Sequence, residues 1–237
     1  MQRYFSNNKK NNIFTLSADD SFHIKKVMRM KKGDRIEIVY ENTQYICKIT
    51  LLEENVQCEV ESIISSEKPK MPKVIIAQSL VKEQKMDYIL QKGTELGAFM
   101  FIPILAQRSI IKIDEKKDTK YIRWSKILKE ASEQCKRVNI PILEKACNLK
   151  EIITGNYDYK FICSVNEKAK TIKSVLSKVD ISDTILFVIG PEGGFSDSEE
   201  KLLIESGFES ITLGENVLRT ETASLFVLSA VNYEFMR

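Results

Sequence analysis

The sequence predicts an α/β protein in which a mostly parallel sheet with flanking helices follows a small β-barrel-like domain. Three observations lead to this fold class. Apolar residues alternate with a period of two from residue 34 to about residue 65. From residue 73 onward, strand-like runs alternate with helical stretches. Near the C-terminal end, two apolar runs are each followed by a loop that contains glycine.

The N-terminal part is predicted to form antiparallel strands. Residues 3–5 indicate a first strand, and residues 19–30 indicate a helix that ends near Gly33. The alternating stretch after it turns near Glu41-Asn42 and again at residues 53–55. We expect residues 1–67 to form the barrel-like domain. A polar segment with two prolines, residues 68–72, is the expected linker to a second domain at residues 73–237.

The second domain is predicted from the alternation of strands and helices, which is typical of a parallel sheet. A serine at position 196 and a glutamate three residues later form a capping box, and Gly207 is placed to end that helix. The last helix is apolar on nearly all sides, so neighbouring helices, a threaded chain or a dimer partner must cover it. We expect strands at 74–77, 99–105, 160–165, 185–189 and 210–213, and helices at 84–96, 119–137, 168–177, 197–205 and 221–235.

Composition excludes several classes of protein. The chain has 237 residues, of which 43% are hydrophobic and 29% are charged, as in ordinary globular proteins. No apolar run approaches the roughly 20 residues that span a bilayer, and the N-terminus has no secretory apolar region. The five cysteines show no CxxC spacing, which argues against a disulfide framework and a zinc site. We therefore expect a cytoplasmic protein without membrane or metal partners.

Charge is unevenly distributed along the chain. The net charge is +3, but residues 1–35 hold nine basic side chains and three acidic ones, a local balance of +6. A basic face can bind the phosphates of nucleic acid, and a lysine-rich solvated surface is the alternative interpretation. Charge alone does not decide between them.

The two glycine-containing loops carry the main functional signal. The first covers residues 188–196 and the second residues 213–223, and glycine lets backbone approach a ligand closely. The first loop alone is also typical of a tight surface turn. A second such loop after a neighbouring strand favours a small-molecule site in an α/β sheet. The chain contains neither GxxxxGK[ST] nor a GxGxxG after a strand, so a P-loop or an ordinary dinucleotide site is not supported.

Together with further blocks, these loops resemble the RsmE family of SPOUT methyltransferases. The resemblance spans nearly the whole chain, in order. The blocks are Arg3-Tyr4-Phe5, residues 23–29 (HIKKVMR), 78–82 (QSLVK), 86–87 (MD), 91–97 (QKGTELG), 107–109 (QRS) and 130–137 (EASEQCKR).

The resemblance implies a fold and an activity. It implies a SPOUT domain with a trefoil knot, a PUA-like RNA-binding barrel before it, and a homodimer assembled through the knot region. It implies S-adenosylmethionine as cofactor and methylation of N3 of a specific uridine (U1498) in 16S ribosomal RNA, either as naked 16S rRNA or in the assembled 30S subunit. The implied cofactor-binding residues are Ile189, Gly190, Glu192, Gly193, Leu213, Gly214, Leu218, Thr220 and Ala223. The expected RNA-binding residues are Arg3, His23, Lys25, Lys26 and Arg29.

The reaction asks little of the side chains. N3 of neutral uracil carries a proton that must leave, and a nearby cation would stabilise the resulting anion. Arg108 and Arg219 are the candidates for this catalytic role. Each is equally compatible with a structural role, paired with a carboxylate such as Glu192 or Glu221. No residue stands out as the base, and water is an alternative proton acceptor.

One further residue and two rival functions bear on this interpretation. His23 is the only histidine, which excludes a histidine-based dyad elsewhere; a lone histidine is usually a surface or packed residue, but its basic surroundings favour an RNA-facing role here. A knotted methyltransferase acting on transfer RNA would share the cofactor loops but not the N-terminal blocks. A non-enzymatic ribosome-assembly factor would have lost cofactor binding, and the glycines at 190, 193 and 214 weigh against that.

Overall fold

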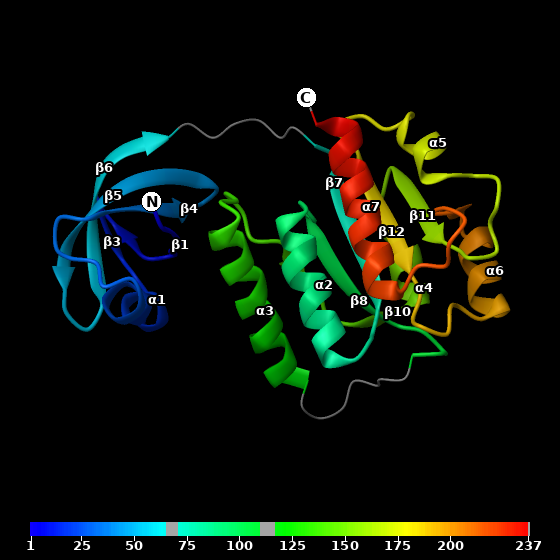
Figure 1. Ribbon diagram of the computed structural model, residues 1–237, viewed down its shortest axis with the longest axis horizontal. Coiled ribbons are helices and arrows are strands. Elements are labelled where there is room, and N and C mark those ends of the chain that lie inside the picture. Colours follow the sequence, from blue (N-terminus) through cyan, green and yellow to red (C-terminus); the bar gives the residue numbers. More distant parts are fainter. Residues whose placement is uncertain (65–70, 110–116, 237) are drawn as a thin grey trace. The chain divides into compact units, whose positions relative to one another are not determined.

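The computed structural model describes residues 1–64, 71–109 and 117–236, and it divides into two compact units (Figure 1). One unit comprises Met1–Lys68 with Ser132–Ile140, and the other comprises Pro69–Ala131 with Pro141–Arg237. The predicted linker at 68–72 lies mostly outside the described residues. Residues 132–140, which the sequence prediction assigns to the second domain, group with the first unit.

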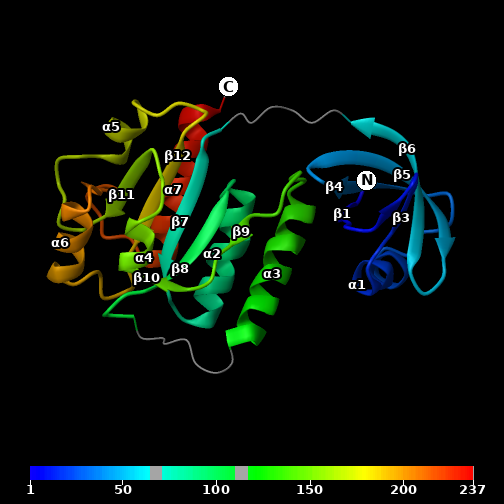
Figure 2. The same ribbon diagram turned by 180° about the vertical axis from the view of Figure 1, so that it is seen from behind.

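A curled sheet forms the first unit (Figure 2). Its strands are β1 (Arg3–Phe5), β2 (Lys9–Lys10), β3 (Ile13–Thr15), β4 (Arg35–Tyr40), β5 (Thr43–Leu52) and β6 (Val56–Ile64). They pair in the order β1-β4-β5-β6-β3-β2, parallel between β1 and β4 and antiparallel elsewhere. The predicted alternation is confirmed, because Ile36, Ile38 and Ile49 all point into one buried core. The predicted turn at Glu41-Asn42 is also confirmed, with φ of 48° and 59° at its two residues.

The predicted helix at 19–30 is wrong in its second half. Helix α1 (Ala18–Phe22), capped by Ser17, passes directly into the π-helix η1 (His23–Val27). The Met28 N–H donates to the His23 carbonyl at 2.9 Å, one residue further back than in an α-helix. Hydrophobic periodicity does not distinguish the two helices over so short a stretch. The wider turn keeps Ile24 in the core before the chain reverses at Arg29, where φ is +52°.

A parallel sheet forms the second unit, where the sequence predicted a mostly parallel one. Its strands pair in the order β10-β8-β7-β12-β11-β13, with β9 also on β8, and these pairings are all parallel. The strands are β7 (Lys73–Ser79), β8 (Met100–Leu105), β9 (Ile142–Leu143), β10 (Cys147–Asn148), β11 (Tyr159–Cys163), β12 (Thr184–Ile189) and β13 (Glu209–Ile211). The short strands β9 and β10 were not predicted.

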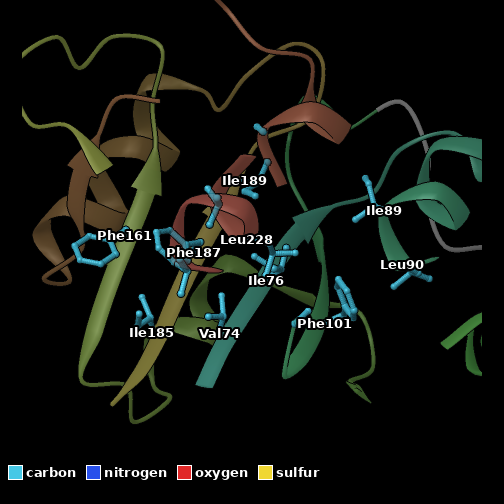
Figure 3. Close-up of a cluster of buried hydrophobic side chains, with 14 of the residues drawn as sticks. Val74, Ile76, Ile89, Leu90, Phe101, Phe161, Ile185, Phe187, Ile189 and Leu228 are labelled. Carbon is cyan, nitrogen blue, oxygen red and sulfur yellow. The ribbon is translucent and has the colours of Figure 1, made fainter. Parts of the chain in front are cut away.

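Helices cover both faces of this sheet. The helices are α2 (Glu83–Glu95), α3 (Lys117–Gln134), α4 (Leu149–Ile153), α5 (Ile172–Leu176), α6 (Asp197–Glu205) and α7 (Thr220–Phe235). Alternate strand residues face opposite ways: Phe187 and Ile189 pack with α2, α5 and α7 (Figure 3), whereas Leu186 and Val188 pack with α4 and α6. The capping box of Ser196 and Glu199 is present as predicted. Helix α4 was missed, and α5 begins later than predicted because Thr171 caps it.

Helix α7 is less covered than its sequence predicts. Val227 and Leu228 are buried against the sheet and α2, but Phe226 is 40% exposed and Tyr233 is 79% exposed. A second buried side is therefore not supplied by the described part of this chain. Among the described residues, no helix is both long and apolar enough to cross a membrane. The trefoil knot stays a prediction from the resemblance.

Candidate cofactor site at the carboxyl ends of the parallel strands

Three neighbouring strands end together at one edge of the sheet. β11 ends at Cys163, which lies level with Ile189 at the end of β12 and with Ile211 at the end of β13. The loops that leave these ends surround a cavity of about 610 Å³. The sequence-predicted cofactor residues all line it: Ile189, Gly190, Glu192, Gly193, Leu213, Gly214, Leu218, Thr220 and Ala223. Both candidate catalytic arginines, Arg108 and Arg219, line the same cavity.

The first loop needs glycine because its neighbours approach closely. A Cβ built on Gly190 would lie 3.3 Å from the Phe195 ring, and one on Gly193 would lie 3.3 Å from Cβ of Arg108. Arg108 also clamps the loop, since its Nη1 donates to the carbonyls of Gly193 at 3.1 Å and Phe195 at 3.0 Å. Among the described residues, Arg108 therefore bonds to the backbone of the loop. The structural alternative considered above was a pairing with a carboxylate, which is not found there.

The second loop needs glycine for its backbone conformation. Gly214 has φ of +131°, which L-residues rarely adopt. The Thr212 hydroxyl donates to the Gly214 carbonyl at 3.1 Å and accepts from the Gly214 N–H at 3.3 Å, which holds this bend. A Cβ built on Gly214 would meet no described atom within 4 Å. The space beside Gly214 is therefore open to a ligand.

A buried hydrogen-bond network joins the two loops. The Thr220 hydroxyl, at the start of α7, donates to the Gly190 carbonyl at 2.6 Å and accepts from Nε2 of Gln78 at 2.9 Å. Oε1 of Gln78 in turn accepts from the Ser224 hydroxyl. Gln78 and Ser224 are completely buried, so the two bonds of Gln78 in this network form away from competing water. The network fixes the first loop against α7 and links both to β7.

A second link lies at the mouth of the cavity. The Lys85 ammonium, on α2, lies 3.1 Å from Oε1 of Glu192 in the first loop and 3.2 Å from Oε2 of Glu221 on α7. Hydrogen bonding to Glu192 raises the pKa of Lys85 above its usual value, although burial opposes this. Partial burial raises the pKa of Glu192, but its backbone hydrogen bond and Lys85 outweigh burial, so this pKa falls below its usual value. Sequence reasoning missed Lys85, which lies more than 100 residues before its partners.

Arg219 differs from Arg108. It is the N-cap residue of α7 and is exposed on the cavity wall, and among the described residues its guanidinium makes no hydrogen bond or ion pair. Glu192 and Glu221, its suggested structural partners, pair with Lys85 instead. Arg219 is therefore a cation of the cavity wall that is available to a ligand.

A third loop completes the wall and was not predicted. It begins at the end of β11, and Cys163, Ser164, Val165, Asn166 and Lys168 line the cavity. The Glu200 carboxylate, on α6, accepts from the Ser164 hydroxyl at 3.0 Å and from Nδ2 of Asn166 at 3.3 Å. This loop contains no glycine, and the only available signal was a serine and an asparagine directly after a strand.

Comparison with known proteins decides the family. A family model described as RNA methyltransferase domain matches residues 67–232, well over half of the 237-residue chain. A second model, described as RNA methyltransferase PUA domain, matches residues 16–61. The chain belongs to this family of RNA methyltransferases. The resemblance found in the sequence, and the PUA-like domain that it implied, are confirmed.

Individual relatives agree with this assignment. The RNA methyltransferase described here is 35% identical to ribosomal RNA small subunit methyltransferase E of Bacillus subtilis (strain 168), over 99% of this chain and 97% of the relative. A putative methyltransferase from Legionella pneumophila, solved with bound SAM, superposes with a TM-score of 0.88 at 28% identity, over 98% of this chain and 97% of that chain. Ribosomal RNA small subunit methyltransferase E from Neisseria gonorrhoeae, bound to S-adenosyl methionine, superposes with a TM-score of 0.83 at 26% identity. The superposition covers 98% of this chain and 97% of that chain.

The cavity of this RNA methyltransferase fits S-adenosylmethionine. Its volume of about 610 Å³ lies within the 300–1,000 Å³ that is usual for cofactor sites. The open space beside Gly214 suits a flat adenine ring, and backbone groups of the second loop suit its polar edge. The carboxylates of Glu192 and Glu200 complement the positive charges of the sulfonium and the amino group. Among the described residues, no cluster of three or more His, Cys, Asp or Glu side chains could hold a metal ion.

The residues predicted to bind RNA are placed unequally in the first unit. Arg3 is 5% exposed, and its guanidinium bonds to Glu37 and to the carbonyls of residues 136 and 137, so its geometry gives an RNA contact no support. Nδ1 of His23 lies 3.0 Å from the Tyr4 hydroxyl. The Lys25 ammonium donates to the carbonyls of Glu53 at 2.5 Å and Glu54 at 3.1 Å. By contrast, Lys26 and Arg29 are exposed, and neither side chain makes a hydrogen bond or ion pair within the described part of the chain.

Proposed function

We propose that this RNA methyltransferase transfers the methyl group of S-adenosylmethionine to N3 of a specific uridine, expected to be U1498, in the 16S RNA of the small ribosomal subunit. The observation that carries the proposal is the cavity where the glycine loops at 190–194 and 213–218 meet, fixed together through Thr220 and Gln78. Relatives named ribosomal RNA small subunit methyltransferase E, one of them solved with the cofactor bound, support the substrate and the cofactor. In this proposal residues 1–67 bind RNA and residues 73–237 carry out the transfer.

The cofactor supplies an already activated methyl group, so the chain has to position its substrates and stabilise charge. The backbone around Leu213, Gly214 and Leu218 holds the adenine. Gly190 and Gly193 allow close approach of the ribose and methionine portions of the cofactor. Arg108 keeps the first loop in shape through its two carbonyl contacts. We assign Arg108 a positioning role in addition to the catalytic role predicted from the sequence.

The uracil N3 proton must leave, and Arg219 is placed to stabilise the anion that forms. Its guanidinium is exposed on the cavity wall beside the cofactor loops. A cation there attracts the negative charge that spreads over the two uracil carbonyl oxygens. Glu192 is a poor base because its pKa is lowered, and its carboxylate is already paired with Lys85. We infer that water accepts the proton.

The expected partners follow from the same assignment. We propose that the substrate is 16S rRNA, naked or in the assembled 30S subunit, and that the protein works in the cytoplasm.

We further propose a homodimer through α7, because the outer face of this helix exposes Phe226 and Tyr233. Leu228 is only 1% exposed within one chain, so Leu228→Glu would disrupt the fold itself. Phe226→Glu is the better test, because Phe226 is exposed and the change should leave the fold intact. Light scattering should show that this variant is a monomer. A wild-type protein that is monomeric and fully active would contradict the proposed dimer.

Methyl transfer can be tested on the natural RNA. The purified protein is incubated with S-adenosylmethionine carrying a radioactive methyl group and with small-subunit RNA, 30S subunits or transfer RNA. Because a methyl group on N3 blocks base pairing, primer extension should stop one nucleotide before the modified uridine. Label in transfer RNA, or a stop at a base other than uridine, would contradict the proposed substrate. Absence of heat on calorimetric titration with S-adenosylmethionine would favour the binding-protein alternative.

A further inference from the structure

An exposed apolar surface lies on the first unit and has no role in its core. Phe22 is 60% exposed, Val27 is 58% exposed and Met28 is 42% exposed, although all three are large apolar residues, from the end of α1 to the end of η1. We call Phe22, Val27 and Met28 the π-turn platform. Ile63, another exposed apolar residue of this unit, lies on strand β6, whereas these three lie within seven residues of one another. A contiguous exposed apolar patch often marks a binding site.

The π-helix η1 brings these side chains together. In a π-turn the hydrogen bond runs from residue i+5 to residue i, as it does here from Met28 to His23 at 2.9 Å. Residue i therefore lies beside residues i+4 and i+5. Phe22 directly precedes η1, so by the same spacing we infer that it neighbours Lys26 and Val27, which would place a cation next to two apolar side chains.

The inner half of the turn is held in place while the outer half is exposed. Ile24 is fully buried, His23 bonds to the Tyr4 hydroxyl, and Lys25 bonds to the carbonyls of Glu53 and Glu54. These contacts fix the backbone of the turn. A preorganised surface loses less conformational entropy on binding than a mobile one.

Charge indicates what covers the platform. Residues 22–32 carry five cationic side chains and no acidic one: Lys25, Lys26, Arg29, Lys31 and Lys32. Pairing of this surface with its own copy would bring like charges together, which is unfavourable. A polyanion with flat apolar faces satisfies both features, because its phosphates attract the cations and its bases stack on the aromatic ring.

We propose that the π-turn platform binds an unpaired base of the RNA substrate, with the base stacked on Phe22 and the neighbouring phosphates held by Lys26 and Arg29. The proposal rests on the RNA methylation proposed above. A base inside a duplex does not expose its face, so this contact selects RNA that is single-stranded where it meets the first unit. Phe22 is then a specificity-determining residue outside the cofactor cavity.

The test measures the affinity of the full-length protein for RNA at several salt concentrations. The probes are a fluorescein-labelled single-stranded RNA of 12 nucleotides and mixed sequence, and the same strand annealed to its complement. Phe22→Ala is compared with Phe22→Tyr, which keeps the ring, and with the double variant Lys26→Ala/Arg29→Ala. Ile63→Ala is the matched control, because Ile63 is a 64% exposed apolar residue on β6 of the same unit.

The expected pattern separates stacking from charge. Phe22→Ala should weaken binding of the single strand about tenfold with an unchanged salt slope, while the duplex is bound as before, and Phe22→Tyr should bind normally. The double variant should reduce the slope of log K against log salt by about 1.4, or about 0.7 for each lost phosphate contact. Ile63→Ala should match the wild type.

Other outcomes overturn the inference. If Phe22→Ala binds the single strand as tightly as wild type, the platform does not stack a base, even where the double variant loses affinity. If Phe22→Ala changes the molecular mass in light scattering or binding to anionic vesicles instead of to RNA, the platform contacts a second copy or a lipid surface. If the variants show the predicted binding pattern but the protein transfers no methyl group to ribosomal RNA, the base-stacking inference holds and the proposed function is wrong.

Discussion

The cofactor cavity and the π-turn platform present their binding groups in different ways. In the cavity, the loops at 190–194 and 213–218 offer backbone groups and open space next to glycine. On the platform, side chains such as Phe22 and Lys26 project from a turn whose backbone is fixed from behind. A site built from backbone groups depends on the conformation of its loops. Distant contacts that hold these loops therefore matter as much as the residues that line the cavity. Side-chain sites depend on residue type, so single substitutions should act locally.

The largest expected effect concerns charge in the cavity. Arg219→Ala should lower kcat about 100-fold, which is the usual result of removing one group that stabilises a developing anion. Cofactor affinity should change little, because in the regions that the structure describes the Arg219 side chain makes no hydrogen bond or ion pair with the loops. Single-turnover methyl transfer and calorimetry measure the two quantities separately. Equal losses in both would show that Arg219 holds the cofactor loop and does not act on the substrate.

The second largest effect is expected from a change at Gly214, whose backbone conformation shapes the second loop. Gly214→Val should weaken S-adenosylmethionine binding by about 10- to 100-fold, since a branched side chain fills the open space and resists φ of +131°. Gly207→Val is the control, because Gly207 also has positive φ, at +83°, but does not line the cavity. Calorimetry should show that only the first variant loses cofactor. Unchanged binding in folded Gly214→Val would remove this loop from the site.

The buried network should have a smaller effect that reaches both stability and binding. Thr220→Val keeps the shape of the side chain but leaves the Gly190 carbonyl and an N–H of Gln78 without a partner. We expect a loss of about 2 kcal/mol in the free energy of unfolding and a several-fold weaker cofactor affinity. Thr222→Val, at an exposed position of the same helix, should change neither. Identical denaturation midpoints for the two variants would contradict the account.

The ion pairs of Lys85 should give the smallest effect, and one that depends on pH. The pKa of Glu192 is lowered in the folded protein, so its contribution to stability is present above its ordinary pKa of 4.5 and is lost as the pH falls through the folded value. The pKa of Lys85 is raised, so its contribution is complete below 10.5 and is lost only above that. The stability difference between wild type and Lys85→Met should therefore be constant from about pH 5 to 10 and shrink below pH 4.

Lys92→Met supplies the comparison for that experiment. Lys92 lies on the same helix and pairs with Glu95 three residues away, so it joins no loops. Lys85→Met should weaken cofactor binding several-fold at pH 7, whereas Lys92→Met should not. Equal affinities for the two variants would mean that the link from α2 to Glu192 and Glu221 has no part in holding the site.

The difference between the two regions also explains what the sequence could predict. The loops at 190 and 214 were identifiable because glycine after an apolar strand is a local signal. The third loop at 163–168 has no such signal, and Lys85 acts through partners that only the fold brings near. The π-turn was predicted as ordinary helix, since a period of 3.6 and one of 4.4 residues cannot be separated over five residues. Burial of Arg3 was equally invisible, because its carbonyl partners come from residues 136 and 137.

Hydrogen exchange in the presence of each ligand tests the comparison most directly. S-adenosylmethionine should slow amide exchange at residues 189–195 and 213–220 and leave residues 22–29 unchanged, because the cavity is built from those loops. A single-stranded RNA should slow exchange or proteolysis at residues 22–29 without the cofactor being present. Protection of residues 22–29 by S-adenosylmethionine alone, with no protection of the two glycine loops, would contradict the assignment of the cofactor to this cavity.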